Sequence, residues 1–420
     1  MIFPEMAVFQ QKLASMPVKD AAGALYEELR QHGSGLAELC GSPVAVAVGS
    51  RRIDRIDEVV AGVVKFLKNL GARPFVVAAM GSHGGATAEG QKALLAGYGI
   101  TEQAMGVPVA ADMDTKVIGH TRAGLPLHIS KAALAAGHVI AVNRIKPHTK
   151  FCAEIESGLC KMLAVGLGNA EGASACHRFA LENSFSFIES AAATLLQCIS
   201  VPLAVGLIED GYCRLSQIRA VPGSSMIDTE KTMLKRAYSM LATIPFKKID
   251  VLVVDRIGKD ISGIGMDSNV TGRHRDITGN FFIAPDPSRI FVRELSPASH
   301  GNANGIGLAD VTTSRLVSQI DTQKTAVNAT AAISPEKAAV PMHFQADKKC
   351  IETCIHTAGI ENGEKARIVR IRNTASLEFI ELSRPLENMA DPGARLKRIT
   401  GWRGWEFDDS GNLFEFYPGM

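Results

Sequence analysis

Short, continuously apolar runs alternate along the chain with segments whose apolar residues recur every three or four positions. The continuous runs predict strands that are buried on both faces, and the periodic segments predict amphipathic helices. This alternation is typical of a parallel sheet with crossover helices. The apolar runs lie at 43–48, 74–80, 138–145 and 202–208, and the clearest helical segments lie at 55–71 and 86–99.

The pattern changes near residue 246, within the connector "IPFKK". A further buried strand is predicted at 249–257, and a glycine-rich polar segment follows at 258–280. Near the end of the chain, 366–373 and 377–384 alternate apolar and polar residues in the manner of an antiparallel pair.

A chain of 420 residues is too long for one compact core. We therefore expect two Rossmann-like α/β domains, 1–245 and 246–420, with an active-site cleft between them. Ligands of such sheets bind beyond the carboxyl ends of the strands.

Charge and cysteine content exclude several classes of partner. The chain has 45 basic and 43 acidic side chains, a net charge of +2, so neither nucleic acid nor an anionic membrane is an expected partner. The first residues lack the pattern of a signal peptide, and Pro202 interrupts the longest apolar stretch. The 8 cysteines form no Cys-x-x-Cys pair and are expected to be reduced thiols of a cytoplasmic protein.

Polar residues with catalytic chemistry follow four of the predicted strands. Any one of these clusters could be structural, because histidines at strand ends are often only hydrogen-bonded and arginines there are often surface charges. Four clusters at the same kind of position favour a shared site. They are Arg51 with Arg52, His83 between glycines, Lys146 with His148, and Lys259 with Asp260.

Lys161 lies in the apolar segment "SGLCKMLAVGLG". Desolvation there would favour the neutral, nucleophilic amine, which can bond covalently to a cofactor. The alternative is a lysine whose stem packs while its ammonium reaches water. The following "GLGNAEG" at 166–172 lacks the spacing and context of a dinucleotide fingerprint, so we interpret its glycines as turn or close-packing positions.

These residues, in this order, resemble the nickel-pincer lactate racemase family of 2-hydroxy acid racemases and epimerases. The likeness is clearest from about residue 40 to 245 and thinner beyond. It is carried by the motifs "GSRR", "GSHGG", "KPH", "GLCK" and "ACH", which contain Arg51, His83, His148, Lys161 and His177.

The resemblance implies two α/β domains and a pyridinium-derived mononucleotide that carries nickel in a sulfur–carbon–sulfur pincer. Lys161 matches the lysine that tethers this cofactor through a thioamide, and His177 matches the histidine that completes nickel coordination. His83 and His148 match the two acid/base histidines, and Arg51 matches the arginine that binds the substrate carboxylate.

The chain departs from the family pattern at several positions. Its tether segment lacks the usual glycine pair before the lysine and the proline-glycine after it, and Arg52 stands where proline is common. We expect Lys259 to bind substrate from the second domain. Asp260, Asp267, Asn269 and Arg273 are further candidates by position only.

Inversion of a 2-hydroxy acid explains why these residue types occur together. Removal of the α-hydrogen as a proton would develop negative charge beside a carboxylate, whereas its removal as hydride leaves a flat 2-keto acid. Two bases are needed, one for each enantiomer, and histidine exchanges protons near neutral pH. The sequence thus predicts a cytoplasmic isomerase that acts on a small 2-hydroxy acid.

Two other functions remain open from the residues alone. One is a zinc-dependent hydrolase or lyase that uses the three histidines with Glu154 or Glu156 as a further ligand, Lys161 being structural. The other is a non-catalytic protein that binds a small molecule or cofactor. The neighbouring Arg51 and Arg52 could also suit a second carboxylate or a phosphate on the substrate.

Overall fold

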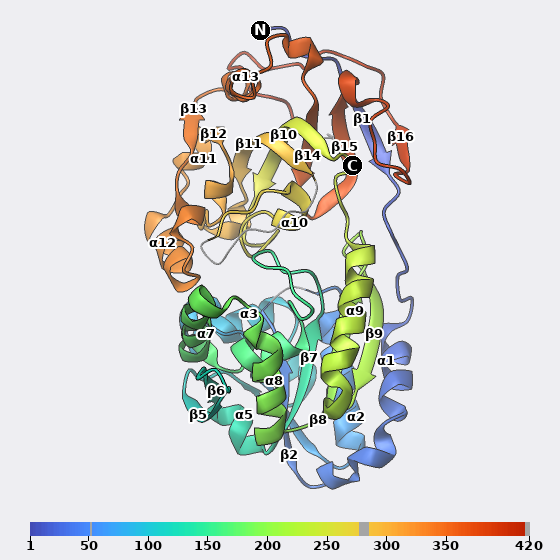
Figure 1. Cartoon of the computed structure of the whole chain (residues 1–420). Coiled ribbons are helices and arrows are strands. Elements are labelled where there is room, and N and C mark those ends of the chain that lie inside the picture. Colours follow the sequence, from blue (N-terminus) through green and yellow to red (C-terminus); the bar gives the residue numbers. More distant parts are fainter. Residues whose placement is uncertain (51–52, 277–284, 416–420) are drawn as a thin grey trace. The chain divides into compact units, whose positions relative to one another are not determined.

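A computed structural model describes residues 1–50, 53–276 and 285–415. The described chain divides into two compact units, one formed by residues 15–241 and the other by 1–14 together with 242–420 (Figure 1). Both contain a mainly parallel sheet covered by helices, which confirms the predicted α/β class. Within the described ranges, no helix is both long and apolar enough to cross a membrane.

The unit 15–241 is built on a sheet with the strand order β4-β3-β2-β7-β8-β9. Neighbouring strands run parallel except for β9, which is antiparallel to β8. The strands are β2 (Pro43–Val48), β3 (Arg73–Ala78), β4 (Val109–Ala110), β7 (His138–Arg144), β8 (Ser200–Glu209) and β9 (Leu215–Val221), and a separate hairpin is formed by β5 (Thr115–His120) and β6 (Pro126–Ser130).

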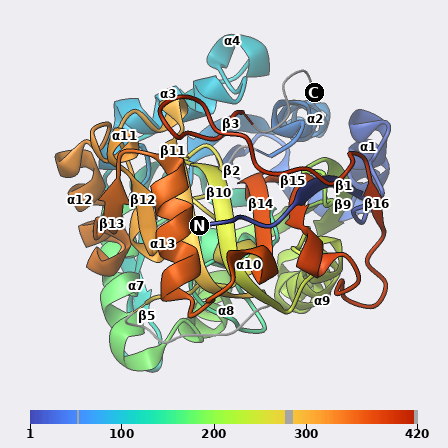
Figure 2. The same cartoon turned by 90° about the horizontal axis from the view of Figure 1, so that it is seen from above.

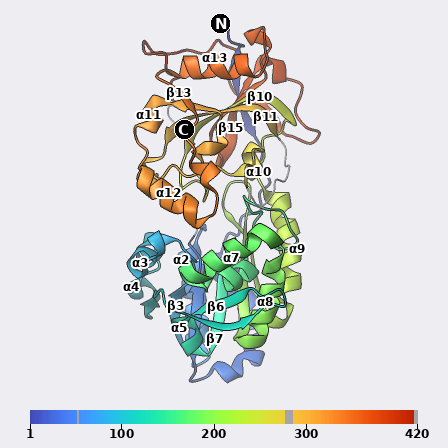
Figure 3. The same ribbon diagram turned by 60° about the vertical axis from the view of Figure 1, so that its left-hand side comes forward.

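Both faces of this sheet are covered, as the continuous apolar runs predicted (Figure 3). In β2, Val44 and Val46 point into one core, while Ala45 and Ala47 point into the other. The first core is shared with α1 (Ala21–Arg30), α2 (Ile56–Asn69), α3 (Ala88–Gly97) and α4 (Glu102–Met105). The second is shared with α5 (Lys131–Ala136), α6 (Leu159–Lys161), α7 (Asn169–Asn183), α8 (Phe187–Cys198) and α9 (Met226–Met240).

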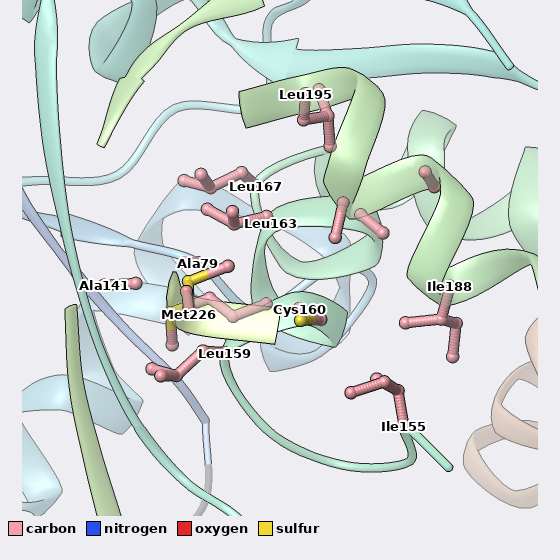
Figure 4. Packing of buried hydrophobic residues seen from close by; sticks show 14 of the residues in the cluster. Ala79, Ala141, Ile155, Leu159, Cys160, Leu163, Leu167, Ile188, Leu195 and Met226 are labelled. Atoms are coloured by element: carbon pink, nitrogen blue, oxygen red, sulfur yellow. The ribbon is translucent and has the colours of Figure 1, made fainter. Parts of the chain in front are cut away.

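The second core seats the segment that contains Lys161. Figure 4 shows Leu159, Cys160 and Leu163 packed among side chains from α8, α9 and the sheet. Cys160 and Leu163 are fully buried. Directly after α6 the chain forms a π-helix, η3 (Met162–Gly166), a widened turn that often occurs at functional sites.

The other unit has the strand order β13-β12-β11-β10-β14-β15-β1-β16 (Figure 2). Its strands are β1 (Met6–Gln11), β10 (Lys248–Ile257), β11 (Asp286–Leu295), β12 (Val311–Thr313), β13 (Met342–Phe344), β14 (Ile368–Asn373), β15 (Ser376–Ser383) and β16 (Leu396–Arg398). Its helices are α10 (Ser268–Thr271), α11 (Ser314–Val317), α12 (Thr322–Ala331) and α13 (Asp347–Thr357). β14 and β15 form the antiparallel pair that the alternating pattern predicted.

The units differ in their bounds from the expected division into 1–245 and 246–420. The strand β1 pairs with β15 and β16, so residues 1–14 join the C-terminal unit, which resumes at Ala242. Pairing between strands more than 360 residues apart leaves no local signal in the sequence. The expected cleft between the domains stays a prediction, because each unit is described by itself.

Candidate active site

The sheet of residues 15–241 changes its direction of winding between β2 and β7. From β2 the chain continues to β3 and β4 on one side, and from β7 it continues to β8 on the other. The carboxyl ends of strands at such a switch point form the usual ligand site of an open parallel sheet. Ser50 follows β2, His83 follows β3, and His148 follows β7 at this edge.

Lys161 and His148 are in direct contact here. The Nζ atom of Lys161 hydrogen-bonds with Nε2 of His148. The backbone N–H of Lys150 donates to Nδ1 of the same imidazole at 3.0 Å. Both nitrogens of His148 therefore have defined partners.

These two hydrogen bonds determine the protonation states that fit the geometry. Because Nδ1 of His148 accepts a hydrogen bond, the neutral imidazole carries its proton on Nε2. An ammonium group has no lone pair, so only an uncharged Lys161 amine can accept from that Nε2–H. A neutral amine is one of the two alternatives that the sequence left open for Lys161, and it stays a prediction.

His177 joins this pair through two aromatic rings. The His148 ring stacks on Phe151 with a centroid separation of 4.3 Å, and Phe151 stacks on Phe185 at 4.4 Å. The ring of His177, on α7, meets Phe185 edge-on at 6.0 Å. The Lys161 amine lies 5.9 Å from the centroid of Phe151. His148, Lys161 and His177 thus lie around the stacked rings of Phe151 and Phe185.

His83 is held at the same sheet edge by different partners. Its Nδ1 hydrogen-bonds with Oγ of Ser50, whose backbone carbonyl accepts from the hydroxyl of Tyr98. The side-chain amide of Gln91, fully buried on α3, donates to the carbonyl of Gly81 at 3.0 Å and to that of His83 at 3.4 Å. Since β2 lies between β3 and β7, His83 and His148 leave the sheet on either side of Ser50.

The loop that carries His148 is organised by a buried carboxylate. Glu156 is 1% exposed and accepts hydrogen bonds from the N–H groups of His148, at 2.6 Å, and Ala153, at 3.1 Å. It also accepts from the hydroxyl of Tyr238, on α9, at 2.8 Å. Burial raises the pKa of the Glu156 carboxyl above its ordinary value.

The glycines of 166–172 are close-packing positions, as interpreted from the sequence. A Cβ atom on Gly166 would lie 2.6 Å from the carbonyl oxygen of Ala79, at the exit of β3. The N–H of Gly81 donates to the Gly166 carbonyl at 2.9 Å. Glycine at 166 therefore lets the π-helix after Lys161 lie directly against the backbone that leads to His83.

Arg51 and Arg52 lie outside the described residues. The segment that follows them is anchored by Glu209, at the end of β8, which accepts from the N–H of Asp54 at 2.8 Å and pairs with Arg144. Glu209 was not predicted from the sequence, because its contacts join segments about 65 and 155 residues away.

Lys259 follows β10 in the other unit. Its Nζ donates to the carbonyl of Gly263 at 2.7 Å and to the side-chain oxygen of Asn328, on α12. Its backbone N–H donates to Oγ of Ser299 at 2.7 Å. The ammonium group is thus oriented by neighbouring loops, and its role in substrate binding stays a prediction.

The other candidates in that unit have structural partners. Asp260 accepts a hydrogen bond from Ser296 at 3.0 Å. Asp267 caps α10 by accepting from the N–H of Asn269 at 3.0 Å, and Arg273 forms an ion pair with Asp310 at 2.9 Å. Their position after β10 agrees with the sequence analysis, and their roles in substrate binding stay predictions.

The described side chains at this edge include potential metal ligands, but no preformed cluster of them. In the described part of the chain, no cluster of three or more histidine, cysteine, aspartate or glutamate side chains is placed to hold a metal ion. Glu156, considered above as a zinc ligand, is engaged by N–H and O–H donors. Of the residues predicted to bind a cofactor, His177 offers an imidazole and Lys161 an amine.

Comparisons with known proteins give a family match over part of this chain and a fold match over most of it. Residues 36–187 match the lactate racemase N-terminal domain family, which confirms the resemblance inferred from the motifs. These residues include His83, His148, Lys161 and His177. No curated protein sequence matches the chain.

Two solved structures have a similar fold. The lactate racemase apoprotein from Thermoanaerobacterium thermosaccharolyticum has 14% sequence identity and a TM-score of 0.53, over 87% of this chain and 94% of that one. A protein from Thermotoga maritima has 12% identity and a TM-score of 0.51, over 79% of this chain and 88% of that one. At these identities the likeness establishes the fold.

Proposed function

We propose that this chain, which carries a lactate racemase N-terminal domain at residues 36–187, racemises or epimerises a 2-hydroxy acid. The observation that carries the proposal is the contact between Lys161 and His148 beside Phe151, Phe185 and His177 at the switch point of the sheet. An amine that can be acylated, a proton-exchanging imidazole and a metal-binding imidazole lie around one aromatic pair.

The residues fit a tethered nickel-pincer mononucleotide. Lys161 would hold the pyridinium ring through a thioamide, and His177 would complete the coordination of nickel. When bound, this group accepts the C2 hydrogen of the substrate as hydride and returns it. The chain itself supplies the binding, orientation and proton transfers.

His83 and His148 would exchange the hydroxyl proton of the two enantiomers. They leave neighbouring regions of one sheet edge, so a small substrate that is turned over between them presents its hydroxyl first to one and then to the other. Ser50 orients the His83 ring through Nδ1. Arg51 would bind the carboxylate and keep C2 in place during this exchange, and Lys259 is proposed as a further substrate-binding residue.

His148 changes its role when the cofactor is attached. Its Nε2 faces the Lys161 amine in the structure, and a thioamide nitrogen no longer accepts that proton. To act as a base through Nε2, His148 must adopt the Nδ1–H tautomer and lose the hydrogen bond from the N–H of Lys150.

The proposal is tested by assaying the protein, produced in a host that makes the pincer cofactor, against a panel of 2-hydroxy acids in deuterium oxide. We expect at least one member to be inverted while C2 retains its own hydrogen, because hydride does not exchange with solvent. Inversion of no member, or incorporation of deuterium at C2, would contradict the proposal.

A further inference from the structure

A second buried carboxylate lies behind Lys161. Glu230, on α9, is 1% exposed and faces the start of α6. Its Oε2 accepts the backbone N–H of Cys160 at 2.8 Å. A carboxylate is costly to bury without such donors, so its place at this turn requires an explanation.

Gly158 and Glu230 are fitted to each other. A Cβ atom on Gly158 would lie 2.2 Å from Oε1 of Glu230 and 2.6 Å from its carboxyl carbon. On the other side, the side-chain amide of Asn143, near the end of β7, donates to the carbonyl of Gly158 at 2.8 Å. The turn before Lys161 is therefore held between α9 and β7.

We propose that Glu230 is the positioning residue of Lys161. By accepting the N–H of Cys160 it keeps α6 in the orientation in which the Lys161 amine meets Nε2 of His148. Without this acceptor, a buried N–H group would lose its partner and the turn would shift to find another. The amine would then leave His148 and become an ordinary protonated lysine.

This inference goes beyond the proposed function and rests on it only for the identity of the group that Lys161 takes. It concerns the reactivity of the lysine before any cofactor is attached. It also explains why a glycine immediately precedes α6: at 158, a larger residue would displace the carboxylate.

The experiment measures acetylation of the full-length, cofactor-free protein by an N-hydroxysuccinimidyl ester at pH 7.5, with peptide mass spectrometry. The rate at Lys161 is divided by the rate at Lys235, an exposed lysine on α9, so that general unfolding of α9 is detected. Glu230→Ala is expected to lower this ratio at least about tenfold, because most of an ordinary lysine is protonated at this pH.

Two further variants separate positioning from general loss of structure. Glu230→Gln retains an oxygen that accepts the Cys160 N–H, so its ratio is expected to stay within about threefold of the native one. Glu189→Gln is the matched control, because Glu189 pairs with Lys231 of α9 outside this turn. It is expected to leave the ratio unchanged.

Gly158→Ala tests the same contact from the other side. It is expected to lower the Lys161 ratio in the native background and to have a smaller further effect in the Glu230→Ala background, where the added methyl group no longer meets the carboxylate and only the contact with Ile145, at 3.0 Å, is left. Equal effects in both backgrounds would overturn the proposal. So would a native ratio in a folded Glu230→Ala protein, or a loss in Glu230→Gln as large as in Glu230→Ala.

These outcomes are independent of turnover. If the acetylation ratios follow the expected pattern but no 2-hydroxy acid is inverted by the loaded protein, the proposed function fails and the positioning role stands. If inversion occurs but the ratios do not respond to Glu230, the positioning role fails and the proposed function stands.

Discussion

At the scale of single residues, the central feature is the contact between the His148 imidazole and the Lys161 amine. The backbone N–H of Lys150 holds the other side of that imidazole. The hydrogen bond from Lys150 to Nδ1 of His148 is compatible with the Nε2–H tautomer, and the contact of Nε2 with Lys161 is then compatible with an uncharged amine. The local apolar sequence around Lys161 left two alternatives open, a desolvated neutral amine and an ammonium group that reaches water. The structure adds a specific partner to that argument.

Removal of the amine should abolish covalent attachment of the cofactor. Lys161→Ala, purified from a host that makes the pincer cofactor, is expected to lack the mass increment that the denatured native protein carries. Intact-protein mass spectrometry measures this, with Lys235→Ala as a control that should keep the increment. An increment on Lys161→Ala would show that the tether is another residue.

Glu230 should make the stability of the fold depend on pH. Burial raises the pKa of its carboxyl to about 7, although it accepts hydrogen bonds at Cys160. The folded protein therefore keeps a proton that the unfolded chain releases, so this contribution is fully present below about pH 4.5 and is lost as pH rises through about 7. The thiol that faces it, Cys160, does not titrate in this range, because burial raises its pKa well above the ordinary value.

Glu230→Gln should remove this dependence. Between pH 4.5 and 8, the free energy of unfolding of the native protein is expected to fall relative to that of the variant by on the order of 2–3 kcal/mol. Urea denaturation at a series of pH values measures the difference. Because Glu156, whose pKa is also raised, is present in both proteins, its contribution cancels. A constant difference across this range would contradict the assignment.

At the scale of elements, the site depends on close backbone contact between the π-helix η3 and the end of β3. The glycine-rich run 166–172 allows this contact, and the N–H of Gly81 completes it by donating to the Gly166 carbonyl. The segment of Lys161 and the segment of His83 are thereby joined without any side chain between them.

Gly166→Ala should destabilise the unit formed by residues 15–241. The added methyl group would lie 2.6 Å from the Ala79 carbonyl oxygen. Because the backbone at Ala79 and the backbone of η3 are both held by their neighbours, we expect the free energy of unfolding to fall by about 1–3 kcal/mol. Thermal unfolding measures it. Gly97→Ala, at the end of α3, is the matched control, because a Cβ atom there has no neighbour within 4 Å, and it should leave stability unchanged or raise it slightly.

At the scale of the whole molecule, the first strand of the chain belongs to the last sheet. β1 lies between β15 and β16, and Phe9 packs against Trp402 with a centroid separation of 5.9 Å. The chain thus begins in one unit, forms the other, and returns at Ala242. Folding of the C-terminal unit requires both ends of the sequence.

Deletion of residues 1–12 should therefore destabilise the C-terminal unit although it removes nothing from residues 15–241. It exposes the edge of β15 and removes the partner of β16. Hydrogen exchange with mass spectrometry is expected to show faster exchange in 376–398 and native rates in β2 and β7. Met16→Ala, at an exposed residue just beyond the deletion, serves as the control. Native rates throughout both units would contradict this account.

The strand and helix pattern could be predicted from the sequence because it depends on local periodicity. The apolar runs at 43–48 and 138–145 are β2 and β7, and the run at 249–257 lies in β10. The parallel, doubly covered sheet followed from runs that are apolar on both faces. The positions of His83 and His148 at the carboxyl edge followed from their places directly after such strands.

The contacts that organise the site depended on the tertiary structure. Phe185, Glu230 and Glu209 are distant in sequence from the residues they orient, and an aromatic or a carboxylate within a helical or apolar pattern has many other uses. For the same reason, the sequence did not show that β1 belongs to the sheet of the C-terminal unit. The sequence by itself determined which elements form and which side chains follow the strands, because these depend on neighbouring residues. The tertiary structure decided which of those side chains meet, because that depends on partners brought together only by folding.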